Sequence, residues 1–156
     1  MKSVMVVLST SRTSEKVLDF AVEKARELEA TLVALYILEK GLANEVFDTF
    51  TDIGFIGDQP SVQITESLMR EYRQRGYEEL GKLQVRAMEA GVEFDPIMEE
   101  GEFVPTVLDN MEKKDVGLAI LVRRKKKKKL LSYFTRSLVE EVTRRAPCEV
   151  VVFDEE

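Results

Sequence analysis

The sequence predicts one α/β domain over residues 1–156, with five strands in a mainly parallel sheet and helices on both of its faces. Two short apolar runs, at Lys2–Leu8 and Thr31–Leu38, have the composition of strands that are buried on both faces. Between them, from Glu15 onward, apolar residues recur at helical spacing. This order of strand, helix and strand is a βαβ unit, whose crossover should be right-handed. Because the alternation continues along the chain, we expect a doubly wound sheet.

The later elements follow the same alternation. We expect strands at Val92–Met98, Leu118–Val122 and Val150–Phe153, and helices at Val62–Ala90, from Pro105, and at Leu130–Arg145. The helix residues expected to face the core are, in chain order, Val17, Leu18, Ala21, Ala25, Leu28, Ile64, Leu68, Tyr72, Leu80, Leu83, Ala87, Val104, Val107, Leu108, Met111, Leu131, Phe134, Leu138 and Val142. The fourth strand is entirely apolar, so it should be central in the sheet.

Glycine and proline indicate where these elements bend, end or meet the edge of the sheet. Pro96 cannot donate to a strand ladder, which places the third strand at an edge. Gly76 and Gly81 each weaken the long helix by up to about 1 kcal/mol relative to alanine, so we expect a bend there. Gly91 is suited to the position just after the end of that helix. Pro105 is suited to the start of the next helix.

A long loop is predicted at about residues 39–61, and loops of this length are often functional. It contains Phe47, Phe50 and Phe55 between glycine residues. One interpretation is that these rings fold back over the core as a lid. The other is an exposed aromatic patch for a partner.

The composition excludes several classes of function. The chain has no histidine and one cysteine, so a standard zinc site, a Ser-His-Asp arrangement and an internal disulfide are all ruled out. We therefore expect a reducing, cytoplasmic location, no metal and no catalytic residues. No apolar run reaches the roughly 20 residues that a membrane span needs. The abundance of Glu, Lys and Arg also occurs in thermophilic proteins.

Charge is distributed very unevenly along the chain. Seven consecutive basic residues follow the fourth strand, namely Arg123, Arg124, Lys125, Lys126, Lys127, Lys128 and Lys129. The rest of the chain has 16 basic and 29 acidic residues, so a general attraction to nucleic acid is not expected. The basic run has three interpretations: a solvated loop, an anion site built from side-chain charges, or a contact with an acidic protein or nucleic acid. Nucleic acid is the weakest of these, because no aromatic residues interleave the run.

Several segments together resemble one family. They are the opening strand followed by Ser11 and Ser14, the turn Gly101–Pro105 before a helix, and the ending Arg136–Val142 with Ala146–Val152. On these segments the chain resembles the universal stress protein family. The resemblance implies a Rossmann-like sheet of the adenine-nucleotide alpha hydrolase type, in order 3-2-1-4-5, and a role in surviving stress. It also implies a homodimer that pairs through the last strand, with Val150, Val151, Val152 and Phe153 in the interface.

One branch of that family binds ATP through a glycine-rich loop after the fourth strand. Its motif positions correspond here to Arg123, Lys126, Arg136 and Ser137, so only the serine is kept. An aspartate that ends the first strand in that branch corresponds to Ser9. Glycines allow the backbone N–H groups to approach phosphate closely, and long side chains at these positions prevent that approach. We therefore expect the usual ATP site to be lost, with no cofactor.

The remaining polar candidates have simpler interpretations. Ser9, Ser11 and Ser14 can contact a nucleotide, but helix capping explains them more simply. Cys148 lies beside a buried strand and is expected to be inert. We expect a stress-related regulatory or protective protein that acts through contacts with an unknown protein, not an enzyme. The alternatives are an ATP-binding protein with Mg and a cationic phosphate loop, and, least favoured, a slow nucleotide hydrolase.

Overall fold

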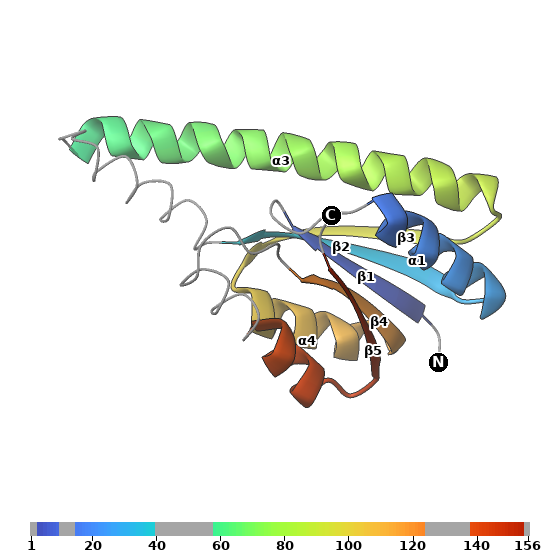
Figure 1. The fold of residues 1–156 in the computed structure, drawn as a ribbon. Helices are drawn as coiled ribbons and strands as arrows, with labels where there is room; N and C mark the ends of the chain where they lie inside the picture. Colours follow the sequence, from blue (N-terminus) through green and yellow to red (C-terminus); the bar gives the residue numbers. More distant parts are fainter. Residues whose placement is uncertain (1–2, 10–14, 40–57, 124–137, 155–156) are drawn as a thin grey trace.

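The computed structural model describes residues 3–9, 15–39, 58–123 and 138–154, with only the backbone described for 58–65. Five parallel strands form one sheet in the order β3-β2-β1-β4-β5, which confirms the predicted fold class and strand order (Figure 1). The strands are β1 (Ser3–Ser9), β2 (Thr31–Glu39), β3 (Phe94–Gly101), β4 (Val116–Arg123) and β5 (Glu149–Asp154). The helices are α1 (Glu15–Glu27), α3 (Asp58–Glu89) and α4 (Phe103–Lys113), and residues 138–145 are also helical.

The helices cover both faces of the sheet. Helices α1 and α3 lie over one face, while α4 and residues 138–145 lie over the other (Figure 1). Because side chains alternate along a strand, β1 supplies both layers of the core. Val4, Val6 and Leu8 pack toward α1 and α3, whereas Met5 and Val7 pack toward α4. Of the helices described, none is both long enough and apolar enough to span a bilayer.

The C-terminal end of α3 differs from the expected boundary of the third strand. Gly91 has a φ of +69°, as predicted for a residue just past a helix end. The next residue, Val92, donates its N–H to the carbonyl of Ala87 at 2.9 Å, so it completes the helix terminus instead of starting a strand. The strand begins at Phe94 and continues to Gly101, beyond the predicted end at Met98, because its last residues still pair with β2. It lies at the sheet edge, as Pro96 predicted.

Long helix α3 begins at Asp58, four residues before the predicted start at Val62. It continues as one straight helix through Gly76 and Gly81, so the expected bend is absent (Figure 1). Gly76 has a packing role that the sequence did not reveal. A Cβ built on Gly76 would lie 2.5 Å from Cε of Met98 and 2.9 Å from the ring of Tyr36. The missing side chain therefore lets the helix lie against β2 and β3.

Most predicted core residues within the described chain are buried or half-buried, and one prediction is wrong. Leu28 is 44% exposed, because α1 ends at Glu27 and the chain turns at Glu29, whose φ is +51°. Asn110 and Val139 are buried although neither was predicted to be. Asn110 satisfies its amide by donating to the carbonyl of Thr106 at 2.9 Å. The predicted positions of Leu131, Phe134 and the three phenylalanines of residues 39–61 lie outside the described residues.

Candidate functional site

The strand order creates one place where a ligand would be expected. Connections from β1 lead to β2 on one side, and β4 lies on the other, so the carboxyl ends of β1 and β4 form the switch point of the sheet. Ser9 ends β1 and Arg123 ends β4. Each lies three residues beyond the paired residues Val6 and Ile120, so the two reach the same level of the sheet. Two of the predicted site residues are therefore neighbours at this edge.

Ser9 is completely buried and belongs to the strand. Its hydroxyl donates to Oε2 of Glu39 at 3.5 Å, across to the last residue of β2. The capping interpretation is wrong for Ser9, because it pairs in the sheet well before α1 begins at Glu15. Ser11 and Ser14 lie outside the described residues. Glu39 was missed as a member of this edge, although an acid directly after an apolar strand would have indicated it.

Arg123 extends its side chain from the end of β4. The side chain is 31% exposed, and Nη1 lies 3.6 Å from Oδ1 of Asp154, its register partner at the end of β5. Asp154 is 80% exposed, so this ion pair is largely open to solvent. Nε of Arg123 is buried and has no hydrogen-bond partner in the described part of the chain. Asp154 therefore belongs to this edge as well.

The other predicted site residues are not placed. Arg124 to Lys129, Arg136 and Ser137 lie outside the described residues, so the three interpretations of the basic run stay open. Among the residues that the structure does describe, no three His, Cys, Asp or Glu side chains are grouped so that they could hold a metal ion. Cys148 is a half-buried free thiol, and burial raises its pKa, which disfavours the reactive thiolate.

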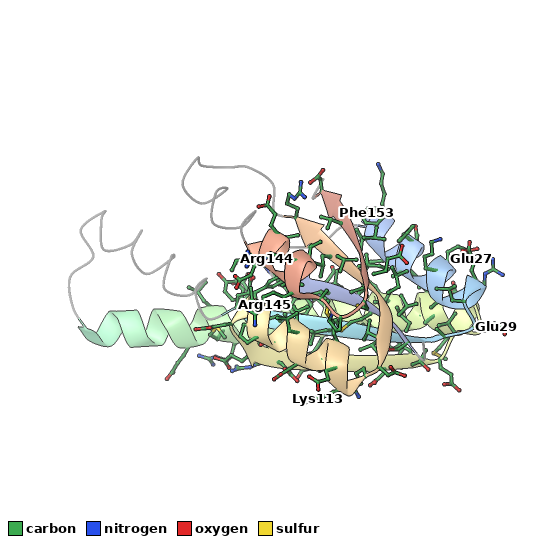
Figure 2. The ribbon with its side chains drawn as sticks, turned by 90° about the horizontal axis from the view of Figure 1, so that it is seen from below. Glu27, Glu29, Lys113, Arg144, Arg145 and Phe153 are labelled. Atoms are coloured by element: carbon green, nitrogen blue, oxygen red, sulfur yellow. The ribbon has the colours of Figure 1, made fainter. Side chains whose placement is uncertain are left out.

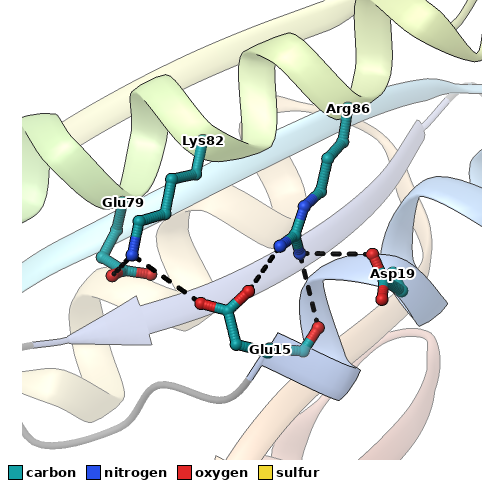
Figure 3. Close-up of polar contacts among 5 residues, drawn as sticks. All are labelled: Glu15, Asp19, Glu79, Lys82 and Arg86. Atoms are coloured by element: carbon teal, nitrogen blue, oxygen red, sulfur yellow. Dashed lines mark hydrogen bonds and ion pairs between the residues drawn. The ribbon is translucent and has the colours of Figure 1, made fainter.

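A group of ion pairs holds the start of α1 against α3 (Figure 3). Arg86 of α3 contacts the carboxylate of Glu15, the first residue of α1, and lies 3.2 Å from Asp19. Lys82 lies 3.7 Å from Glu15 and 3.2 Å from Glu79. The hydrogen bond from Arg86 lowers the pKa of Glu15 most; burial opposes this, and the charges of Arg86 and Lys82 add to it. These contacts join the first turn of α1 to the C-terminal half of α3.

Comparison with known proteins identifies the family. The universal stress protein family matches residues 1–154, nearly the whole chain. The chain belongs to this family. Comparison of the sequence with curated proteins gives no match.

Solved universal stress proteins share the fold at low sequence identity. UspA from Lactobacillus plantarum is 17% identical, with a TM-score of 0.69 and 97% of each chain covered. A family member from Burkholderia pseudomallei is 21% identical, with a TM-score of 0.66 over 97% of this chain and 95% of that one. The protein from Archaeoglobus fulgidus, solved in complex with dAMP, is 14% identical, with a TM-score of 0.56 and 97% of each chain covered. At this level of sequence identity, the similarity to these structures shows that the fold is shared.

In this universal stress protein, Ser9 and Arg123 are the predicted cofactor-binding residues that the structure describes. Arg123 places a Cβ and a long stem at the end of β4, where its Nε is buried. Ser9 provides a neutral hydroxyl that is engaged with Glu39.

The last strand of this universal stress protein lies at an open edge of the sheet. Val150, Val151, Val152 and Phe153 are half-buried in β5, and in the described chain β5 pairs only with β4. The ring of Phe153 lies 4.8 Å from that of Phe20 in α1, and Phe153 lies beside that helix (Figure 2). Among the described strands, β5 is therefore an edge strand, and the dimer through it stays a prediction.

Proposed function

We propose that this chain is a regulatory or protective universal stress protein that acts through contacts with other proteins and does not hold ATP in the family's usual way. Membership of the family makes it a stress-related protein. The finer proposal rests on one observation above all, which is that an arginine side chain occupies the end of β4 at the switch point. Without the glycine-rich phosphate loop, the protein would not bind ATP in the family's usual way. It would then act by binding other proteins through its surface.

The edge around Arg123 supports this proposal through its charges. Asp154 ends β5, directly beside β4, and Glu39 ends β2, which lies beyond β1. Like charges repel at short range, so these two groups oppose a polyphosphate chain that lies along the edge. With no histidine in the sequence and no acidic cluster among the described residues, we propose that the protein is not an enzyme.

A second candidate is nucleotide binding through side-chain cations. The relative from Archaeoglobus fulgidus was solved with dAMP, a nucleotide with a single phosphate. The sequence places six further basic residues directly after Arg123, and these can neutralise phosphate as point charges. In this alternative the nucleotide would bind with Mg in an altered pose.

The partner in the assembly is proposed to be a second copy of the chain. The open edge of β5, with four consecutive apolar residues from Val150 to Phe153, supports pairing between two copies. We also propose a cytoplasmic location, because a chain with one cysteine forms no internal disulfide.

Thermal unfolding with and without ATP and magnesium tests the proposed function. A site filled at 100 times its dissociation constant adds about 2.7 kcal/mol of stability, which for a chain of this size raises Tm by roughly 5–10 °C. We expect ATP to give no larger shift than tripolyphosphate at the same concentration. A shift that needs the adenine ring would contradict the proposal and favour the second candidate.

A further inference from the structure

The outer face of α3 carries a line of exposed apolar side chains. Of the four large apolar side chains that are exposed in the described chain, three lie on this helix, with Tyr77 at 61%, Val85 at 55% and Met88 at 70%. Together with Gly81 they recur at spacings of four, four and three residues, so they lie along one face of the helix. The sheet lies against the opposite face, and no described element covers this one (Figure 1). These four residues form the α3 stripe.

Gly81 lies in the middle of the α3 stripe, and packing within the chain does not explain it. Glycine weakens a helix interior relative to alanine. A Cβ at Gly81 would meet nothing within 4 Å, so the sheet does not require a glycine there. On an exposed face, a glycine leaves room for another backbone to come close. With apolar side chains on either side of it, this position favours a second helix lying across α3.

The apolar residues fit a second copy of the same helix that runs in the opposite direction. A two-fold interface must be self-complementary, because the same surface serves both copies. If the two helices cross at Gly81, Tyr77 of one copy reaches the level of Val85 of the other, because each lies four residues from the crossing. A large side chain therefore meets a smaller one on both sides of the crossing.

Charges beside the α3 stripe fit the same arrangement. Arg73 and Glu89 each lie eight residues from Gly81, so an antiparallel copy brings opposite charges to the same level at both ends. Both side chains are exposed, and Arg73 also lies 3.7 Å from Glu100 of β3. Between Arg73 and Glu89, no like charges fall at the same level. A parallel copy would instead set two arginines and two glutamates against each other.

We propose that the α3 stripe binds the α3 stripe of a second copy of this chain, with the two helices antiparallel and crossing at Gly81. This surface is distinct from the edge at β5, since α3 packs on β2 and β3 and β5 lies at the other edge of the sheet. The stripe spans about 16 Å of helix, and so small a contact makes the association weak and dependent on concentration. The inference goes beyond the proposed function, because this surface can join two dimers that have formed through β5.

Sedimentation velocity of the full chain with Val151→Lys, which opposes pairing through β5, tests this surface by itself. Between about 10 and 500 µM, we expect the sedimentation coefficient to rise toward that of a dimer. Val85→Lys should abolish the rise, because it buries a charge in the contact. Leu28→Lys is the matched control, since Leu28 is an exposed apolar residue outside α3, and it should leave the rise unchanged.

Three results of this experiment would overturn the proposal: no rise, a rise that persists in Val85→Lys, or a rise that Leu28→Lys also removes. Circular dichroism checks that each variant folds. If Val151→Lys does not fold, the same comparison is made in the wild-type chain, where Val85→Lys should remove the larger species.

Gly81→Ala should stabilise the chain and weaken the association at the same time. The new Cβ meets nothing within one copy, but two of them collide where the helices cross, so the dissociation constant should rise about tenfold. Arg75→Ala is the control, because Arg75 is exposed, lies off the stripe and pairs with Glu71. An unchanged dissociation constant in Gly81→Ala would overturn the crossing at Gly81.

Two charge reversals test the antiparallel direction. Arg73→Glu and Glu89→Arg each set like charges at the same level in a pair of identical copies, so each variant alone should associate more weakly than the parent chain. An equal mixture of the two variants restores opposite charges at both levels, so it should associate as the parent does. The contact of Arg73 with Glu100 stays lost in the mixture, so it cannot produce this recovery. A mixture that associates no better than the separate variants would overturn the antiparallel arrangement.

Discussion

Gly76 has no Cβ, and this lets α3 lie close to the sheet at that point. The nearest atoms to a Cβ there belong to Met98, whose terminal methyl can shift, and to the ring of Tyr36, which is 1% exposed and held by the core. Gly81 lies five residues further along the same helix, and a Cβ there would meet nothing within 4 Å. Gly76 is therefore required for close packing of the helix on the sheet, whereas Gly81 is not.

Alanine at these two positions should change stability in opposite directions. Gly76→Ala overpacks the core at a cost of about 1–3 kcal/mol, against a gain in helix propensity of up to about 1 kcal/mol, so we expect a net loss. Gly81→Ala gains the propensity without the clash, so the free energy of unfolding should rise by about 0.5–1 kcal/mol. Urea denaturation of both variants measures the difference. A Gly76→Ala variant as stable as Gly81→Ala would contradict this account.

Glu15 should titrate differently once Arg86 is removed. Its pKa in the folded chain is lowered, mainly by the hydrogen bond from Arg86. The stability that the pair contributes is therefore present above the ordinary glutamate pKa of about 4.3 and is lost as pH falls through the lowered folded value. Glu15 is 60% exposed, so the contribution is below about 1 kcal/mol.

Carbon-13 NMR titration of the Glu15 carboxyl measures this effect. Arg86→Gln should raise the pKa toward its ordinary value. Arg75→Gln is the control, because Arg75 pairs with Glu71, 2.9 Å away, on the same helix. If both variants leave the titration of Glu15 unchanged, the assigned role of Arg86 is wrong.

At the scale of single residues, the sequence predicted which side chains are buried better than it predicted which side chains contact each other. Apolar spacing correctly identified buried positions such as Leu18 and Leu83. It failed at Leu28, because spacing does not show that α1 ends one residue earlier. The contact of Ser9 with Glu39 joins two strands 30 residues apart in sequence, and no local pattern contains that information. The sequence therefore predicted which residues belong to the candidate site, but it did not predict which of them contact each other.

At the scale of elements, edge strands are the places where the sheet can still form hydrogen bonds. β3 and β5 are the two edges. β3 carries Pro96 and an acidic end, features that discourage pairing. β5 carries the apolar residues Val150 to Phe153, which favour pairing with another strand. The sequence predicted both strands, yet it placed the start of β3 two residues too early because Val92 resembles a strand residue while it completes the end of α3.

Val151→Lys should convert the proposed dimer into a monomer. A charged side chain in the middle of β5 opposes pairing of two copies, because lysine on an edge strand discourages the addition of another strand. Light scattering measures the mass, and circular dichroism confirms that the variant is folded. Pro96→Lys, on the opposite edge, is the control and should leave the mass unchanged. A dimer that persists in folded Val151→Lys would move the interface elsewhere.

At the scale of the whole molecule, the chain has the fold of its family, and its function depends on the side chains at the carboxyl edge of the sheet. The strand order was predictable through the family resemblance, because the ending Ala146–Val152 and the turn Gly101–Pro105 are recognisable from sequence. The fold alone does not set the function. At the carboxyl edge of the sheet, the proposed function rests on Arg123, which ends β4 and pairs with Asp154 at the end of β5.

Titration calorimetry of the full chain with ATP and magnesium, at about 50 and 300 mM salt and beside tripolyphosphate, tests the central claim most directly. We predict no binding that depends on adenine: any heat at low salt should be matched by tripolyphosphate and should vanish at high salt, where exposed charges are screened. Adenine-dependent binding that survives high salt would contradict the account and show that a nucleotide site exists without the glycine loop.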